Sequence, residues 1–311
     1  VETSPYHGKD PLKRTVTELI QNSLILLDKP CGPTAHQVDS WVREIFSTVK
    51  VGHAGTLDPK VTGLLPLGLG RATRALSVLS EAGKEYVCIM RLHEPIDQQK
   101  LEDAFSTFTG TITQLPPLRS AVKRVKRKRK IYYLNLLEKN ENEVLFRIGC
   151  ESGTYVRTLC VDIGKHLGIG AHLAELRRTK VGLFTEKGIV TLHDVKDSYE
   201  FYKEGDPSSL KSILQPIERV FDHLPKIIIR DSAIDAICHG ATLALPGVVE
   251  VETGISKGVN VALFSMKDEI VATGSATMST EDMIQKDSGI CVNTEKVFMN
   301  KGTYPAIWKK H

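Results

Sequence analysis

Asp58 is the first candidate for chemistry in this sequence, because it lies in a glycine-rich loop between apolar segments. Gly52, Gly55 and Gly63 allow the backbone to approach a bound molecule closely, and Pro59 fixes the backbone directly after the aspartate. A carboxylate held in this way can act as a nucleophile or as a general base. An aspartate before proline is also a common turn residue, so the loop composition alone leaves both interpretations open.

Several other kinds of site are not supported by the sequence. The glycine-rich loop lacks the G-x-x-x-x-G-K-[ST] pattern of a phosphate-binding loop, and the segment from Gly68 to Thr73 lacks the third glycine of a dinucleotide fingerprint. The six cysteines lie far apart without a C-x-x-C pair, which fits neither a zinc pattern nor a disulfide framework. We therefore expect mostly buried thiols and a reducing, intracellular compartment.

The positive charge of the chain is concentrated in one segment. The chain has 41 Lys and Arg against 37 Asp and Glu, for a net charge of +4. Residues 104–137 contain no acidic residue, and their basic residues are Arg119, Lys123, Arg124, Lys126, Arg127, Lys128, Arg129 and Lys130. Such a run is usually a solvated face or a disordered arm. This one follows two prolines and leads into an expected strand, so we predict a loop between two strands that lies along nucleic-acid phosphates.

The elements that must position Asp58 form a mixed α and β pattern. Thr34 is a plausible N-cap for a helix whose apolar side chains, Val38 and Val42 among them, recur at helical spacing. No regular βαβ repeat is present, which favours the α+β class. The expected strands are residues 24–28, 86–93, 131–137 and 144–150, a loop covers 52–70, and further helices include residues 101–108 and 156–167.

The last third of the chain has a different texture. After a polar boundary zone at 197–215, short strands are expected at 226–230, 259–266, 270–277 and 289–298, with one brief helix at 232–239. This pattern predicts a small β-barrel-like domain. A chain of 311 residues is long enough for two domains, and no apolar run approaches the roughly 20 residues that cross a bilayer.

Several motifs together resemble the TruB-type pseudouridine synthases. Residues 52–63, GHAGTLDPKVTG, are similar to the catalytic signature of that family. The resemblance continues with LDKP at 27–30, KEY at 84–86, GTYVRT at 153–158 and LRRT at 176–179, in the same order and spacing over roughly residues 24–185. Within the family the chain is most similar to dyskerin and its archaeal counterparts, the catalytic subunits of H/ACA ribonucleoproteins. That similarity includes PPL at 116–118, AVKR at 121–124, residues 231–240 and GTYP at 302–305 through Trp308. The end at His311 without a long lysine-rich tail favours the archaeal type.

The resemblance implies a domain organisation. Residues 23–222 would be the catalytic domain, with a mixed, mainly antiparallel sheet and flanking helices, and residues 223–311 would be a PUA RNA-binding domain. Residues 1–22 would be an extension that packs on the PUA domain.

The resemblance also implies roles for individual residues. Asp58 would attack the target nucleoside or remove a proton from it, and Arg157 would pair with Asp58, keeping it ionised and oriented in a largely dry pocket. Tyr86 would stack on the target base, although core packing is the alternative for Tyr86 as it is for Tyr155 and Leu176. The remaining pocket residues are Tyr155 on the floor, Leu176 as an apolar wall, Lys84, and Lys29 and His53 as RNA contacts, a structural hydrogen bond being equally plausible for His53. The implied RNA-binding residues are Arg119, Lys123, Arg124, Lys126, Arg127 and Lys128 in a thumb-like loop, and Gly240, Ala241, Leu245, Pro246 and Gly247 in a turn of the PUA domain.

The implied activity is the isomerisation of uridine to pseudouridine in rRNA or tRNA. Uracil is detached from its sugar and reattached through carbon, so the resemblance implies no metal and no organic cofactor. The target base must leave the RNA stack, and stacking on Tyr86 would partly offset that cost. The enzyme would be guided by H/ACA RNA, with accessory proteins, in the processing of rRNA and tRNA and in ribosome biogenesis.

Two alternatives remain open at this point, a stand-alone tRNA T-loop pseudouridine synthase and a non-catalytic RNA-binding scaffold. The expected compartment is the cytoplasm for an archaeal protein and the nucleolus for a eukaryotic one. The target uridines cannot be read from the sequence, because a guide RNA would select them by base pairing.

Overall fold

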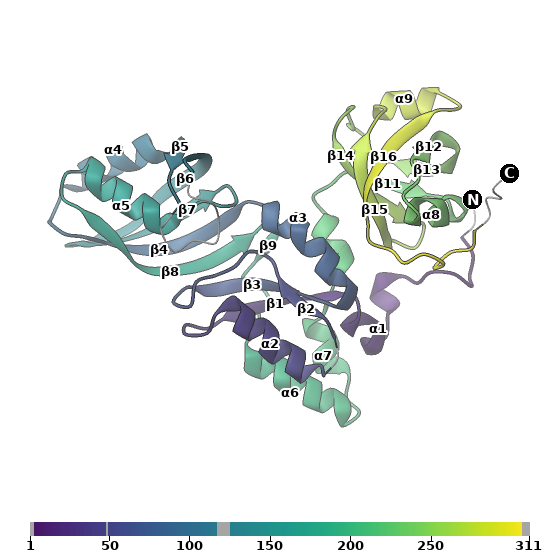
Figure 1. Cartoon of the computed structure of the whole chain (residues 1–311), viewed down its shortest axis with the longest axis horizontal. Helices are drawn as coiled ribbons and strands as arrows, with labels where there is room; N and C mark the ends of the chain where they lie inside the picture. Colours follow the sequence, from purple (N-terminus) through teal and green to yellow (C-terminus); the bar gives the residue numbers. More distant parts are fainter. Residues whose placement is uncertain (1–2, 48, 117–124, 307–311) are drawn as a thin grey trace. The chain divides into compact units, whose positions relative to one another are not determined.

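The computed structural model describes residues 3–47, 49–116 and 125–306 (Figure 1). The chain divides into two compact units. Unit 1 comprises Val1–Leu24, Gly68–Ala75 and Leu214–His311, and unit 2 comprises Ile25–Leu67 and Leu76–Ile213. The domain limits expected from the sequence stay a prediction. Within residues 3–47, 49–116 and 125–306, no helix has the length and apolar character needed to span a bilayer.

A large, mainly antiparallel sheet carries most of unit 2. Its strands follow the order β10-β1-β3-β8-β4-β7-β6-β5, with β2 beside β3 and β9 beside β8. Strand β4 is antiparallel to both of its neighbours, β7 and β8, whereas β3 and β8 run parallel. The strands are β1 (Ser23–Lys29), β2 (Val51–His53), β3 (Thr62–Leu69), β4 (Lys84–Leu92), β5 (Gly110–Gln114), β6 (Arg127–Asn140), β7 (Glu143–Cys150), β8 (Ala171–Val181), β9 (Phe184–Thr185) and β10 (Gln215–Pro216).

Helices flank this sheet, as Figure 1 shows. Helices α4 (Gln98–Phe108) and α5 (Val156–His166) cover β4, β6, β7 and β8 on one face, and their shared core includes Phe105, Phe146 and Leu159. Helix α2 (Ala35–Ile45) lies beside α6 (Leu192–Lys203), and α3 (Leu76–Glu81) and α7 (Ser208–Ile213) are shorter. Helix α2 begins where expected, because the Thr34 side chain accepts a hydrogen bond from Gln37 N in a capping box. The predicted α+β class with a mainly antiparallel sheet is confirmed.

The structure corrects the expected elements of unit 2 in several places. The segment 52–70 contains β2 and β3 instead of one long loop, because the apolar run of β3 is buried along almost its whole length despite its glycines and proline. Residues 127–130 belong to β6, where they pair with β5, so the basic loop is shorter than expected. Strand β8 and helix α6 were not predicted, since charged and polar side chains obscure their periodicity. Of the six cysteines, five are buried and Cys31 is exposed.

The second sheet lies in unit 1 and has the order β12-β16-β15-β14-β11-β13. Each expected strand is present, and Ile229, Leu263 and Val271 contribute to a core closed by helices. The expected single helix is accompanied by a second one, α9, which the sequence analysis missed along with β12 and β13. The elements are β11 (Lys226–Ile229), α8 (Asp231–Cys238), β12 (Leu243–Ala244), β13 (Val248–Val251), β14 (Asn260–Ser265), β15 (Ile270–Ala276), α9 (Thr280–Gln285) and β16 (Ile290–Val297).

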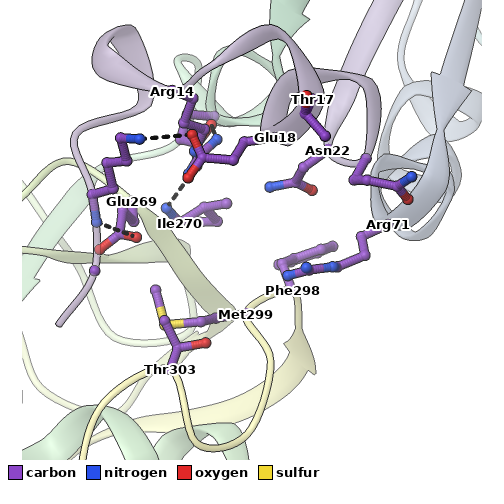
Figure 2. Close-up of a pocket in the computed structure, with 14 residues that line it drawn as sticks. Arg14, Thr17, Glu18, Asn22, Arg71, Glu269, Ile270, Phe298, Met299 and Thr303 are labelled. Carbon is purple, nitrogen blue, oxygen red and sulfur yellow. Dashed lines mark hydrogen bonds and ion pairs between the residues drawn. The ribbon is translucent and has the colours of Figure 1, made fainter.

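The N-terminal segment of unit 1 is tied to this second sheet and its connections by polar contacts. Ser4 N donates to Asp231 Oδ2 at 2.7 Å, and Lys9 N donates to Glu269 Oε1 at 3.0 Å. Arg14, which precedes α1 (Val16–Ile20), makes two parallel hydrogen bonds with the Glu218 carboxylate at 2.8 and 2.9 Å. A cavity of about 500 Å³ remains beside these contacts, and Figure 2 shows Arg14, Glu269 and Phe298 among its lining residues.

Candidate active site

The loop that carries Asp58 connects β2 to β3 and is held by hydrogen bonds along its backbone. Val61 N donates to Asp58 O at 3.0 Å, which closes a turn directly after the aspartate. The buried Lys29 ammonium donates to the carbonyl oxygens of Pro30, Pro59 and Val61 at 2.9–3.1 Å. Lys29 therefore holds the loop through its backbone carbonyls. This role differs from the RNA contact expected for Lys29.

Arg157 forms the expected ion pair with Asp58, and it does so from the first turn of α5. The helix dipole disfavours a cation at that end, so the carboxylate offsets an otherwise unfavourable charge. The Arg157 and Asp58 side chains are 52% and 53% exposed. The pair therefore lies at an open mouth, in contrast to the largely dry pocket that the sequence analysis expected.

A cavity of about 730 Å³ opens beside this ion pair, within the size range of pockets that hold small ligands. It brings together side chains from the Asp58 loop, β4, β8 and the turn before α5. The expected site residues that line it are Asp58, Lys84, Tyr86, Tyr155, Arg157 and Leu176. Lys29 and His53 are not part of the lining.

Tyr86 and Arg178 meet inside this cavity across neighbouring strands. Their backbones are paired in the register of β4 and β8, and the Arg178 guanidinium is hydrogen-bonded to the Tyr86 side chain. Arg178 is only 1% exposed, and it also donates from Nε to Leu64 O at 2.8 Å and from Nη2 to Ala54 O at 3.3 Å. Burial raises the pKa of the Tyr86 phenol above its usual value, although the nearby guanidinium opposes that shift, so Tyr86 is neutral at physiological pH.

Arg178 is the main site residue that the sequence analysis missed. The signal was present in the LRRT segment, because alternate residues of a strand face the same side and Leu176 was already assigned to the pocket. It went unused because β8 itself was not predicted.

Lys84 lines the cavity with its stem while its ammonium group is buried against backbone. The Nζ atom donates to Ser80 O at 2.6 Å and to Ala82 O at 2.7 Å. Burial, together with the positive charge of Arg178, lowers the pKa of Lys84 to about 8. The ammonium therefore serves to join the end of α3 to the start of β4.

Tyr155 and His53 are both held by hydrogen bonds. The Gln114 side chain accepts from Tyr155 N and donates to Tyr155 O, at 3.0 and 3.1 Å, which fixes the turn that precedes α5. His53 Nδ1 lies 2.6 Å from Asp39 Oδ2, and His53 Nε2 lies 3.2 Å from Thr56 Oγ1. For His53 the structural hydrogen bond that the sequence analysis kept open is present.

The expected RNA-binding residues fall into three groups. Lys126, Arg127 and Lys128 are exposed. Arg127 and Lys128 belong to β6 and pair with β5. The expected residues Arg119, Lys123 and Arg124 lie outside the described residues. In unit 1, exposed Gly240, with a φ of 87°, and exposed Ala241 follow α8, and Pro246 is exposed before the half-buried Gly247, whereas Leu245 is buried in the core.

Four family models match the chain in succession. They are the DKCLD (NUC011) domain at residues 1–39, the TruB family pseudouridylate synthase N-terminal domain at 43–102 and 93–156, the tRNA pseudouridylate synthase B C-terminal domain at 157–222, and the PUA domain at 225–298. Together they span most of the chain in the order that the motifs indicated.

The chain is also similar to curated proteins over nearly its whole length. It is 54% identical over 309 residues to the probable tRNA pseudouridine synthase B of Methanopyrus kandleri, covering 99% of this chain and 91% of that protein. It is 52% identical to the protein of the same name from Methanothermobacter thermautotrophicus, covering 99% of this chain and 95% of that one.

Solved structures give the same match in three dimensions. A structure of an H/ACA RNP bound to a substrate RNA containing 2′-deoxyuridine includes a chain with a TM-score of 0.90 and 46% identity, covering 99% of this chain and 94% of that chain. A crystal structure of a Cbf5-Nop10-Gar1 complex includes a chain with a TM-score of 0.90 and 48% identity, covering 98% of this chain and 93% of that one.

Proposed function

The chain belongs to the TruB family of pseudouridine synthases, which are RNA isomerases, and on this premise we propose that Asp58 is the catalytic residue of a guide-RNA-directed enzyme. The observation that carries the proposal is the ion pair of Asp58 and Arg157 at the mouth of a cavity that also contains Tyr86. The family membership and the PUA domain expected from the sequence are confirmed.

The geometry supports a simple division of roles in the cavity. In the reaction the bond from the sugar C1′ to N1 of uracil breaks, a bond from C1′ to C5 forms, C5 loses its proton and N1 gains one. Asp58 supplies the carboxylate that attacks the nucleoside or removes a proton from it. Arg157 orients that carboxylate and favours its ionised form, because an adjacent opposite charge stabilises the anion.

The substrate base must leave the RNA stack to reach Asp58. A cavity of about 730 Å³ offers room for a flipped nucleotide, and the neutral Tyr86 ring offers a stacking surface. The exposed side chains of Lys126, Arg127 and Lys128 are accessible to RNA phosphates, and contacts of that kind give affinity without base preference. Exposed Gly240 and Ala241 would provide a second RNA contact in the PUA domain.

The similar chains in H/ACA RNP and Cbf5-Nop10-Gar1 structures favour the guided form of the reaction. We accordingly assign to this chain an H/ACA guide RNA, a substrate RNA and accessory proteins of the kind present in those complexes. The relatives compared above come from archaea, which favours the cytoplasm as the compartment. The second candidate, a stand-alone tRNA synthase, rests on the name that those relatives carry, tRNA pseudouridine synthase B.

A nearest-neighbour pseudouridine assay tests both candidates. The purified chain is given either a guide RNA with its matched substrate or a tRNA transcript, each with and without accessory proteins. Guided modification that requires the full mixture and disappears in Asp58→Asn, a variant of the same shape, supports the proposal. Asp103→Asn, at an exposed aspartate of α4, is the matched control and should keep full activity. Strong activity on tRNA alone would favour the stand-alone enzyme, and activity retained in Asp58→Asn would overturn the assignment of Asp58.

A further inference from the structure

Three potential metal ligands converge outside the catalytic cavity. His36 and Asp39 occupy the first turns of α2, and His53 ends the neighbouring strand β2. One ligand atom from each of the three lies within 4.8 Å of the others. None of the three lines the cavity that contains Asp58.

The Asp39 carboxylate is the centre of this cluster. Its Oδ2 atom lies 2.6 Å from His53 Nδ1 and 3.8 Å from His36 Nδ1. Asp39 is only 6% exposed, and its Oδ1 atom is buried without a hydrogen-bond partner among the residues that the structure describes. Burying a carboxylate with one oxygen unpartnered is costly, and a cation bound by that carboxylate would offset part of the cost.

From these observations we propose that His36, Asp39 and His53 bind a divalent transition-metal ion of the Zn²⁺ type. Two imidazoles and one carboxylate suit zinc and its neighbours in the first transition row. Zinc bound to nitrogen and oxygen at about 2.0–2.2 Å in a tetrahedron keeps its ligand atoms roughly 3.4 Å apart. The separations of Asp39 Oδ2 from His53 Nδ1 and from His36 Nδ1, 2.6 and 3.8 Å, lie on either side of that value. The 81% exposed side chain of His36 is free to close on the ion.

The second ring nitrogen of His53 supports the same assignment. Metal-binding histidines usually donate their other ring N–H to a protein oxygen, which fixes the tautomer and the orientation of the ring. His53 Nε2 lies 3.2 Å from Thr56 Oγ1, so a ring that binds metal through Nδ1 has its acceptor already in place. The bound ion would keep one position open, since the protein supplies three ligands.

Such an ion would connect the start of α2 to the strand that leads into the Asp58 loop. His53 is followed by Ala54, Gly55 and Thr56 before the chain reaches Asp58. An ion at His53 would therefore restrain the entry to the loop, as Lys29 restrains its exit.

Isothermal titration of the chelator-treated full chain with ZnCl₂ at neutral pH tests the proposal. Because the exposed Cys31 thiol could also bind zinc, the titrations use the Cys31→Ser background. We expect one saturable site, weakened at least about tenfold in His36→Ala. His36 is exposed, so this variant should fold as the parent does. The matched control is His172→Ala, because exposed His172 lies 3.0 Å from His93 in a second histidine pair.

A visible absorption spectrum with Co²⁺ in place of Zn²⁺ gives a second readout. A tetrahedral site should give an intense band in the parent and in His172→Ala and lose it in His36→Ala. Absence of saturable Zn²⁺ binding, or binding that survives in His36→Ala, would overturn the proposal and leave an ordinary hydrogen bond between His53 and Asp39. No RNA is present in these titrations, so their failure would not bear on the pseudouridine synthase activity.

Discussion

Arg157 contacts Asp58 in an ion pair whose two side chains are exposed to nearly the same extent, 52% and 53%. Exposed ion pairs add little to folding stability, typically about 0–1 kcal/mol. The pair is therefore better explained by the orientation of the Asp58 carboxylate than by stability, and this distinction can be measured.

Replacing Arg157 by alanine should reduce turnover while leaving the fold intact. We expect turnover to fall on the order of 10²-fold, because a misplaced reactive group loses about that much rate. The midpoint of thermal unfolding should change little. The matched control is Arg91→Ala, since Arg91 forms an ion pair with Glu143 at similar exposures of 55% and 50%. Equal losses of turnover in both variants would contradict an orienting role for Arg157.

Two substitutions of Tyr86 separate its ring from its hydroxyl group. Tyr86→Phe keeps the ring and removes the bond with Arg178, so it should cost about 1–2 kcal/mol of stability and little activity. Tyr86→Ala also removes the stacking surface, which is worth about 1–3 kcal/mol per base. Urea unfolding would measure the change in stability, and single-turnover assays with RNA titration would measure activity and base stacking. If Tyr86→Phe were as inactive as Tyr86→Ala, the hydroxyl group and not the ring would be the essential part.

Lys84 should make stability depend on pH in a defined direction. Its pKa is lowered from 10.5 to about 8 in the folded protein, chiefly by burial. Between these two values the unfolded chain binds more protons than the folded one, so the contribution of Lys84 to stability rises as pH increases from about 8 to 10.5 and is least below pH 8.

Urea unfolding of the wild type and of Lys84→Met at pH 7 and at pH 9.5 measures this contribution. The free energy of unfolding of the wild type, relative to that of Lys84→Met, should increase at the higher pH. Taking this difference cancels the titration of the buried thiols. An exposed lysine, Lys187→Met, should show no such change. A constant difference for Lys84→Met would mean that its ammonium group remains charged throughout.

The basic end of β6 should determine part of the salt dependence of RNA binding. Changing Lys126, Arg127 and Lys128 to serine should lower the slope of log affinity against log salt by about 0.7 for each RNA phosphate that is no longer neutralised. Filter binding at several salt concentrations gives the slope. The control triple replaces Lys187, Lys196 and Lys203, and an equal change there would show that only net charge matters.

Removing Arg14 should destabilise unit 1 strongly. Arg14 and Glu218 form two hydrogen bonds at 2.8 and 2.9 Å, and each side chain is only 10% exposed. Arg14→Ala leaves a buried carboxylate unpaired and should cost about 3–5 kcal/mol. Calorimetry of the full chain measures the loss, and a second replacement, Glu218→Leu, should restore part of it. A loss no larger than that of Arg91→Ala would show that the Glu218 carboxylate finds another partner or is hydrated.

The sequence was most informative where one short motif contained both the residue and its neighbours. Asp58, Arg157 and Tyr86 each lie in a motif that resembles the family, and that resemblance implied the Asp58–Arg157 contact, which the structure contains. Arg178 was missed because its position depends on β8, whose charged side chains do not show the alternation of a half-buried strand. The sequence motifs pointed to Lys29 and Lys84, but the ammonium groups of both residues face backbone carbonyls, and residue type alone cannot indicate that. In such cases the tertiary fold, and not local pattern, decides the surroundings.

Strand β4 has a continuous ladder of hydrogen bonds on both sides, whereas the Asp58 loop is held by isolated backbone bonds such as Val61 N to Asp58 O and Gly32 N to Pro59 O. Interior strands exchange their amide protons only through large cooperative openings, while loops open in small local ones. The Asp58 loop and β4, which both line the proposed catalytic cavity, should therefore open at different rates. As the protein is warmed, the loop that bears the carboxylate should open first, while the platform for the base on β4 persists. Such an enzyme would stop turning over while it could still hold its RNA, and a warmed preparation would then act as a competitor of its own intact molecules.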